Sequence, residues 1–429
     1  MIYSTSAAAN EWMHLLCALS PQLIHPMPPE NAASENAAAM ILAACRNAGI
    51  EAFLKSAADN REPLLLAVND AHRFTDTASA IECIILEIDK SKLNLRLRLL
   101  VCTGSHQIEN PAEALMHEKA MIGPHRERFE AIDWHNAFDP GRLMPLAGED
   151  GVRMHHWMAE SGHILAIGSM EPHYFAGITG AHKTLTIGAF AYEDITANHF
   201  NALSPDAEGL KMDGNPIYEG LAAVIRQMET AGKHLFAINE VMSGAKVSAC
   251  YAGRPLESLH RAAPEIRRRY GRQLPLQDLI VSIVHPPLNR DLYQADKGIK
   301  NVEPAVRDGG TIILDAQCAG GVGISRFFQL LKRSPTHAQA VRFVEDDGYQ
   351  LGDHKAVRLR ALTDRRKVRL LAYAPGLEEN EAEICGIQLF NSREQAAQWA
   401  MEQLALQAGH VTVVDDAGNL TLQKTEHST

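Results

Sequence analysis

Short apolar runs recur along the chain, and each is followed by a polar loop and then by a helical pattern of apolar positions. This alternation is typical of parallel strands flanked by helices. Six runs stand out: Leu64–Val68, Leu97–Cys102, His163–Ile167, His234–Asn239, Leu279–Val284 and Thr311–Ala316. The pattern therefore predicts an α/β fold with mostly parallel sheets.

Helix-start signals mark two of the intervening segments. Thr75–Ile88 opens with Thr75 and Asp76 as capping residues, and Asn215–Ala231 carries Pro216, which suits a first helical turn. Near the end of the chain we expect a helix at Ser392–Gln407 among strands at Lys367–Ala372, Gly386–Phe390 and Val411–Val414.

The length of 429 residues predicts two domains, because single cores stop growing near ~250–300 residues. A helical segment near Arg254–Leu276 ends in a charged stretch with Gly271 and Pro275, which suits a connection between domains. We expect an N-terminal α/β domain at 1–265, a hinge at 266–277 and a C-terminal α/β domain at 278–429, with the active-site cleft between the two domains.

Composition excludes several classes of protein. The net charge of −11 argues against a nucleic-acid partner. No apolar run approaches the ~18 residues of a membrane span, and the start lacks the basic region of a signal peptide, so we expect a cytoplasmic protein. The seven cysteines include no C-x-x-C pair, which makes a zinc ribbon improbable. Half of the 20 histidines fall between His106 and His199, which hints at acid–base or metal chemistry.

Polar clusters follow four of the apolar runs, at the places where ligands bind in open α/β sheets. They are Asp70 with His72 and Arg73, then Thr103–Gln107, Glu171–Lys183 and Asn289–Lys297. The fork of Arg73 matches a substrate carboxylate, although a loop salt bridge is the plainer reading. His106 projects from a strand end after Gly104, as an ordinary turn histidine also would.

The third cluster is the most informative. Four of its residues could cradle a phosphate through backbone N–H groups: Gly177, Thr179, Gly180 and Lys183. Ala181 and His182 stand where a P-loop needs glycine, which argues against a Walker NTPase. Lys183 is either a nucleophile or covalent anchor, or a surface lysine.

Two further features, His199 and the cluster around Tyr293, are weaker signals of a site when each is taken by itself. His199 lies on a helix or at its end, and a lone imidazole suffices for a metal only if a cofactor supplies the remaining ligands. Tyr293, Asp296 and Lys297 lie on neighbouring turns of an expected helix, where they either enter the cleft or form an exposed helix start.

Taken in order, these clusters resemble the nickel-pincer lactate racemase family from about Leu64 to at least Gly323. The family's D-x-T-R motif looks like Asp70–Arg73, its G-T-H motif like Gly104–His106, and its H-x-F-A-G-x-S-G-G-x-K motif like His173–Lys183. Its N-H ahead of a D-G-N-P stretch is similar to Asn198 and His199 followed by Asp213–Pro216, and its Y-Q-x-x-K motif is matched by Tyr293, Gln294 and Lys297.

The resemblance implies racemisation or epimerisation of a small 2-hydroxy acid through a 2-keto acid. It implies a pyridinium-type mononucleotide that carries nickel in a sulfur–carbon–sulfur pincer and is made by separate cofactor-biosynthesis enzymes. Lys183 would tether this cofactor covalently, and His199 would ligate the nickel. His106 and His173 would be the paired acid/bases. The remaining roles fall to Arg73, Tyr293, Gln294 and Lys297 on the substrate, and to Asp70, Gly177, Thr179 and Gly180 on the cofactor.

Departures from the family pattern bear on the substrate. His72 and Phe74 replace the usual Thr and Pro, Gln107 replaces a common Arg, and Ala181 replaces a Gly. We expect a 2-hydroxy acid larger or more polar than lactate, because His72 and His182 add imidazoles near the cleft.

Two rival functions stay open. One is a zinc hydrolase that binds its metal through some of four histidines: His106, His155, His156 and His173. The other is a binding protein that has kept the cleft and lost turnover.

Overall fold

The computed structural model describes residues 5–27, 36–108, 110–146, 148, 151–243, 246–404 and 408–425. The chain divides into two compact units. The first comprises Pro29–Asn201 and Asp206–Ile266, and the second comprises Met1–Pro28, Ala202–Pro205 and Arg267–Thr429.

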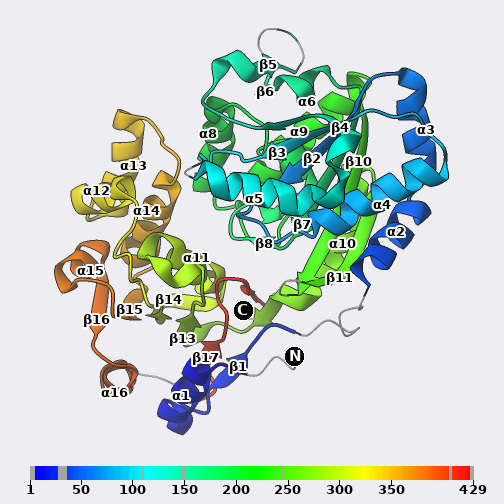
Figure 1. The fold of residues 1–429 in the computed structure, drawn as a ribbon. Helices are drawn as coiled ribbons and strands as arrows, with labels where there is room; N and C mark the ends of the chain where they lie inside the picture. Colours follow the sequence, from blue (N-terminus) through cyan, green and yellow to red (C-terminus); the bar gives the residue numbers. More distant parts are fainter. Residues whose placement is uncertain are drawn as a thin grey trace. The chain divides into compact units, whose positions relative to one another are not determined.

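The first unit is built on a six-stranded sheet with the order β11-β10-β7-β2-β3-β4 (Figure 1). Its strands are β2 Leu64–Asn69, β3 Leu97–Cys102, β4 Phe129–Trp134, β7 His163–Met170, β10 His234–Ser243 and β11 Lys246–Gly253. All neighbours are parallel except β10 and β11. From β2 the chain first winds to β3 and β4, and it then winds in the opposite direction to β7 and β10. The carboxyl ends of β2 and β7 therefore form a topological switch point.

Helices cover this sheet on both faces. Alternate residues of β2, namely Leu64, Leu66 and Val68, pack in one cluster with Ile41 and Leu54. That face carries α2 Ala37–Asn47, α3 Ile50–Asn60 and α4 Thr77–Lys90. The unit's other helices are α5 Pro111–Ile122, α6 His156–Glu160, α7 Ala181–Leu185, α8 Tyr192–Phe200, α9 Pro216–Thr230 and α10 Pro255–Tyr270.

The helix starts predicted at polar caps are present. The side chain of Asp76 accepts a hydrogen bond of 3.2 Å from the Ser79 N–H, which caps α4. Asn215 accepts one of 3.0 Å from the Ile217 N–H, with Pro216 in the first turn of α9. Side-chain caps satisfy N–H groups that have no partner within the helix.

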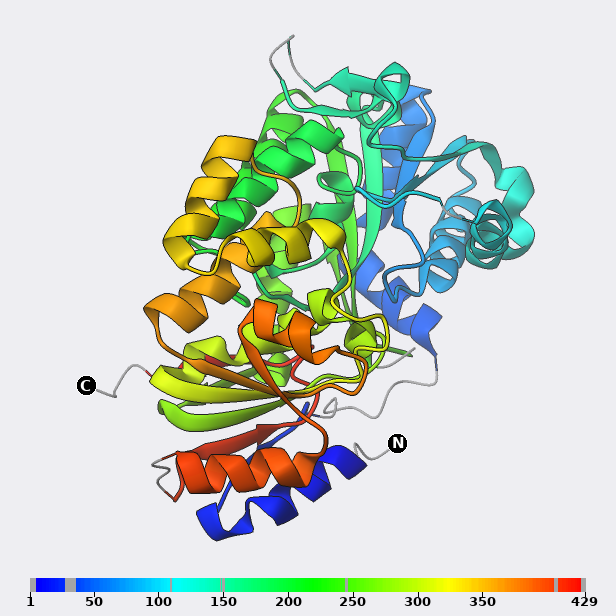
Figure 2. The same ribbon diagram turned by 90° about the vertical axis from the view of Figure 1, so that its left-hand side faces the viewer.

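A second six-stranded sheet, all parallel, forms the other unit, in the order β1-β17-β13-β14-β15-β16 (Figure 2). Its strands are β1 Gln22–Ile24, β13 Gln277–Ile283, β14 Val306–Asp315, β15 Arg369–Tyr373, β16 Ile387–Phe390 and β17 Val411–Val414. A separate parallel pair joins β12 Gly271–Leu274 to β18 Thr421–Lys424.

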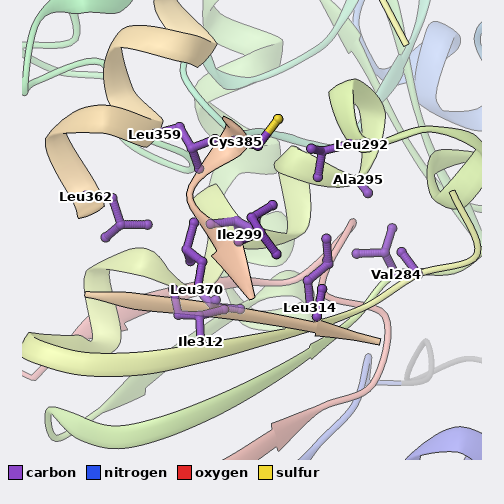
Figure 3. Packing of buried hydrophobic residues seen from close by; sticks show 14 of the residues in the cluster. Val284, Leu292, Ala295, Ile299, Ile312, Leu314, Leu359, Leu362, Leu370 and Cys385 are labelled. Atoms are coloured by element: carbon purple, nitrogen blue, oxygen red, sulfur yellow. The ribbon is translucent and has the colours of Figure 1, made fainter. Parts of the chain in front are cut away.

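Two layers of helices enclose this second sheet. One face packs Ile312, Leu314 and Leu370 against Leu292 and Ile299 of α11 (Figure 3). That layer contains α11 Leu292–Val302, α12 Ser325–Arg333, α13 His337–Asp347, α14 Asp353–Arg360 and α15 Glu379–Cys385. The other face is covered by α1 Ala7–Leu15 and α16 Arg393–Gln403, which lie side by side (Figure 2).

The predicted α/β class with mostly parallel sheets in two domains is confirmed. The compact units differ from the predicted boundaries, because Met1–Pro28 belongs to the second unit. The physical reason is that β1 pairs with β17 and that Trp12 of α1 is fully buried against the second sheet. The segment 266–277, predicted as a hinge, contains the end of α10 and strand β12.

The predicted helix Ser392–Gln407 is present as α16, with Ser392 as its N-cap and its last turn at Gln403; residues 405–407 lie outside the described part of the chain. No single helix in the described ranges combines the length and hydropathy of a membrane span, although the bent pair α2 and α3 has that length and composition when taken together.

We expect Trp12→Ala to lower the free energy of unfolding by about 3–5 kcal/mol, the usual cost of emptying a buried aromatic site. Trp12 is fully buried, and its indole N–H donates a 2.6 Å hydrogen bond to Asp315. Urea denaturation followed by circular dichroism measures the change, with the exposed Asn10→Ala on the same helix as control. Equal stability of the two variants would contradict the packing of α1 on the second sheet.

Candidate functional site

Three polar loops leave neighbouring strands of the first sheet at its carboxyl edge. Asp70–Arg73 follows β2, Thr103–His106 follows β3, and Glu171–Lys183 follows β7. Since β2 lies between β3 and β7, and adjacent strands are ~4.8 Å apart, the three loops start within about 10 Å of one another. The switch point thus gathers three of the four predicted clusters.

Asp70 holds two imidazoles. Its Oδ2 accepts hydrogen bonds from Nδ1 of His106 at 2.8 Å and from Nδ1 of His72 at 3.1 Å. Burial works against ionisation of Asp70, but these hydrogen bonds outweigh it and hold the pKa of the carboxyl well below its usual range. Because Nδ1 of His106 carries the donated hydrogen, Nε2 carries the lone pair in the neutral ring.

An ion pair joins the loops of β2 and β7. The guanidinium of Arg73 contacts the carboxylate of Glu171, and both side chains are about one-third exposed. Thr179 fixes Glu171 in turn, because Thr179 N–H donates to the Glu171 carbonyl at 2.8 Å and Glu171 N–H donates to the Thr179 hydroxyl at 3.0 Å. Arg73 is therefore held at the switch point.

His173 has the opposite tautomer to His106. The Ala176 N–H donates to Nδ1 of His173 at 3.3 Å, so Nε2 of the neutral ring carries the hydrogen. The ring of His173 lies 4.4 Å from that of Phe175, and Phe175 lies 5.2 Å from His199, centroid to centroid. One aromatic chain thus connects His173 to His199.

His199 is a neutral imidazole with a fixed tautomer. Its Nδ1 donates to the Ile195 carbonyl of α8 at 2.9 Å, so Nε2 carries the lone pair. Burial and the positive charge of Lys183 lower the pKa of His199 to about 4. A neutral imidazole whose other nitrogen donates to a backbone carbonyl is the usual form of a metal-ligating histidine.

The turn around Lys183 is fixed by two asparagines, one from each of the strands that flank β7. Asn239 of β10 accepts a 2.8 Å hydrogen bond from the Ala181 N–H, and Asn69 of β2 accepts one of 2.8 Å from the Thr184 hydroxyl. Sequence reasoning assigned neither asparagine to the site. The available signal was a polar residue at the end of an apolar run, because a buried amide needs hydrogen-bond partners.

The predicted phosphate cradle is not formed by the N–H groups of three of its four residues. Gly177, Thr179 and Lys183 donate their N–H groups to the carbonyls of Glu208, Glu171 and Gly180. Gly177 is needed for shape: its φ is +74°, and a Cβ there would lie 2.2 Å from the Lys211 carbonyl oxygen. Any role of Gly177, Thr179 and Gly180 in holding a cofactor stays a prediction.

Asn215 of the D-G-N-P stretch holds the loop that contains Phe175 and Gly177. The side-chain amide of the fully buried Asn215 donates to the carbonyls of Phe175, Glu208 and Lys211 at 2.9, 3.1 and 3.1 Å. Leu210 N–H donates to the Gly177 carbonyl at 3.0 Å. Asn215 therefore positions the loop that follows His173.

His182 does not add polarity to the site, contrary to the expectation drawn from its place in the sequence. Its side chain is completely buried, and neither ring nitrogen has a hydrogen-bond partner in the described part of the chain. Burial and the charges of Lys183 and His260 lower its pKa to about 3. Of the two added imidazoles, only His72 remains exposed, with 64% of its side chain accessible.

The fourth cluster lies in the second unit. Tyr293, Gln294 and Lys297 lie on α11 and are partly exposed, whereas Asp296 is buried. The ammonium of the buried Lys355 lies 4.1 Å from the centre of the Tyr293 ring, a cation–π contact that fixes the ring. The predicted helix is confirmed, and the predicted substrate contacts of these three residues stay untested.

The histidines proposed for the rival zinc site fall into separate groups. His106 joins Asp70 and His72, whereas His155 and His156 lie near Asp133, with ligand atoms in each group within 4.8 Å of one another. His155 donates a 3.2 Å hydrogen bond to Asp133. The described residues therefore offer no single site for the four histidines.

Comparison with protein families gives two matches in succession. The model of the lactate racemase N-terminal domain matches residues 15–210, and that of the lactate racemase C-terminal domain matches residues 277–417.

Similar curated proteins include two lactate racemases. The enzyme of Thermoanaerobacterium thermosaccharolyticum is 26% identical over 289 residues, which are 66% of each chain. The enzyme of Lactiplantibacillus plantarum is 28% identical over 246 residues, which are 55% of each chain. The chain thus matches less than two thirds of the length of either relative.

Two solved structures share the fold. The lactate racemase apoprotein of T. thermosaccharolyticum superposes with a TM-score of 0.79 at 18% identity, covering 94% of both chains. A protein from Thermotoga maritima superposes with a TM-score of 0.62 at 13% identity, covering 87% of this chain and 97% of that one.

His182 predicts a loss of stability in acid. Its pKa is about 3 in the folded protein and ~6.5 in the unfolded chain, so below pH 6.5 the unfolded state binds more protons. Above pH 6.5 the ring is neutral in both states and costs no unfolding free energy. As the pH falls from 6.5 toward 3, the unfolding free energy decreases progressively, because only the unfolded state gains the proton. From pH 7.5 to 5 we expect His182 alone to cost about 2 kcal/mol of unfolding free energy.

Urea denaturation at both pH values checks this expectation. The acid-induced loss should shrink by about 2 kcal/mol in His182→Leu, whereas the exposed His14→Leu should retain the wild-type loss. An unchanged pH dependence in His182→Leu would mean that the buried ring is protonated in the native state.

Proposed function

We propose a function from one premise: this chain belongs to the lactate racemase family. On that premise, it interconverts the two configurations at the carbinol carbon of a small 2-hydroxy acid. The observation that carries the proposal is the pair His106 and His173, whose neutral rings have opposite tautomers and whose loops leave the two strands on either side of β2.

The two histidines suit proton transfer on opposite sides of a planar intermediate. The C–H of an unactivated 2-hydroxy acid is too weakly acidic for a histidine, so the carbon must lose hydride while its hydroxyl loses a proton. His106 accepts the hydroxyl proton at Nε2, which leaves a planar 2-keto acid. Return of hydride to the opposite face, with a proton from Nε2 of His173 in its doubly protonated, imidazolium form to the oxygen, inverts the centre and leaves His173 neutral. The reverse direction exchanges the two roles.

Arg73 is the residue that we assign to the substrate carboxylate in the first unit. Its planar guanidinium has five N–H donors, so it can contact Glu171 and a second carboxylate together. Tyr293, Gln294 and Lys297 are the predicted substrate-binding residues of the second unit.

The residues around Lys183 fit a tethered nickel cofactor. Lys183 would form the covalent bond, and His199 would ligate nickel through Nε2, because its Nδ1–H is committed to the Ile195 carbonyl. The neutrality of His199 at physiological pH supports this assignment, since only the neutral ring binds metal. The nickel-pincer nucleotide, when bound, supplies the acceptance and return of hydride. Its synthesis and attachment make cofactor-biosynthesis enzymes the expected partners.

The substrate that we propose is larger or more polar than lactate. With His182 buried, this proposal rests on His72 alone, which stands exposed beside His106 with the ring centroids 4.1 Å apart. An imidazole there can donate to or accept from a polar substituent of the substrate.

A chiral assay of single enantiomers of 2-hydroxy acids tests the function, with protein expressed beside cofactor-making enzymes. We expect inversion, preferring an acid other than lactate, and a loss of about 10²–10⁴-fold in His106→Ala and in His173→Ala. His156→Ala should retain wild-type turnover. Saturable binding without inversion would make the chain a binding protein, and preference for lactate would end the substrate proposal.

Intact mass spectrometry and metal analysis test the attachment. We expect a nucleotide-sized adduct in the wild type that is absent from Lys183→Ala. His199→Ala should retain the organic adduct and lose nickel, because only the metal ligand is removed. An adduct in Lys183→Ala, or full nickel in His199→Ala, would show that the corresponding residue is misassigned.

A further inference from the structure

Three side chains at the carboxyl ends of β2 and β3 converge on one point. Nδ1 of His72 and Nδ1 of His106 both lie within hydrogen-bond distance of the same carboxylate oxygen, Asp70 Oδ2, at 3.1 and 2.8 Å. The three ligand atoms all lie within 4.8 Å of one another. One carboxylate oxygen therefore accepts hydrogen bonds from two imidazole rings.

This geometry is close to that of a metal site. Zinc binds imidazole nitrogen at ~2.0–2.1 Å and carboxylate oxygen at ~2.0–2.2 Å, so adjacent ligand atoms of a tetrahedral site are about 3.3 Å apart. The two nitrogen–oxygen distances at Asp70 fall short of that spacing by only a few tenths of an ångström. Small side-chain rotations would admit an ion, and two histidines with one carboxylate are a common set for a zinc ion that also binds water.

Charge and access favour the same conclusion. Asp70 is ionised at neutral pH and only 8% of its side chain is exposed, while its Oδ1 accepts the His72 N–H at 3.1 Å, so it is a fixed anionic ligand. The side chains of His72 and His106 are 64% and 49% exposed, which leaves an ion a path from solvent. Arg73, which follows His72 in the chain, pairs its charge with Glu171 instead.

The second group of potential ligands, Asp133 with His155 and His156, is less suited to a cation. Arg142 contacts the carboxylate of Asp133 and neutralises its charge. His155 is completely buried, with Nδ1 accepting the Trp157 N–H and Nε2 bonded to Asp133. This group is satisfied without an ion, and it supplies a matched control.

We propose that Asp70, His72 and His106 form a binding site for one zinc ion. His72 is the residue that completes it, because the family's D-x-T-R motif has threonine at that position, and threonine is a poor zinc ligand. An ion on Nδ1 of His106 places the ring hydrogen on Nε2, which removes the lone pair from that atom. If His106 is the base of the proposed racemase, zinc at this site inhibits turnover; the binding itself does not depend on that function.

Zinc titration of the full-length, chelator-stripped protein tests the site, with calorimetry or competition against a chromophoric chelator as the readout. Neither nickel cofactor nor substrate is present, so the result is independent of the proposed function. We expect one equivalent of zinc to bind to the wild type through this site. His72→Thr and Asp70→Asn should each weaken zinc binding by about 10–100-fold or more. Loss of a partner that only orients a ligand already costs that much, and these variants remove a ligand itself.

The matched control is His156→Ala, which disrupts the second group and should leave the affinity unchanged. Circular dichroism checks that each variant is folded, and the exposure of His72 makes its replacement mild. Zinc affinity that is unaffected by His72→Thr, or absent from the wild type, would overturn it.

Discussion

The reversal of winding at β2 governs where the polar loops of the first unit come together. Strands β3 and β4 follow β2 directly in the chain and lie on one side of it, whereas β7 and β10 come later and lie on the other side. The loops after β2 and β7 therefore lead away from each other at the carboxyl edge of the sheet. The ion pair of Arg73 with Glu171 spans this divergence. Without the reversal, a helix connection would cover the carboxyl edge between the two strands, and the loops that carry His106 and His173 would not flank a common strand.

Each histidine of the site receives its character from the partner of its Nδ1. A carboxylate holds His106, a backbone N–H holds His173, and a backbone carbonyl holds His199. Acceptors at Nδ1 leave a lone pair on Nε2, and a donor at Nδ1 leaves a hydrogen there. The partner of Nδ1 thus gives His106 and His199 one tautomer and His173 the other, a difference that residue type alone does not set.

Much of the fold follows from local pattern. The ranges expected for β3 and β17 agree with the structure to the residue, because apolar runs between turn signals bound a buried strand tightly. The start of α4 follows from Asp76 as its cap. The placement of α1 and β1 could not be predicted in this way, since β1 pairs with β17 and is too short to carry a pattern of its own.

The site was predictable at the level of motifs and less so at the level of contacts. The sequence predicted Asp70, His106 and Lys183 as site residues because each follows an apolar run, and the sheet places their loops at one edge. Sequence order does not show where each backbone N–H is donated, and the N–H groups of Gly177, Thr179 and Lys183 are bonded to backbone carbonyls. The burial of His182 depends on packing from distant segments, which no local pattern encodes.

The pairing of β1 with β17 has a consequence for biosynthesis. Gln22 lies opposite Thr412, so the two partners are 390 positions apart, 412 minus 22. At ~5–20 residues per second, a ribosome needs about 20–80 seconds to make the chain between them. During that interval the amphipathic N-terminal segment has been released without the strand that it will join, and the second sheet can be completed only when nearly the whole chain has emerged.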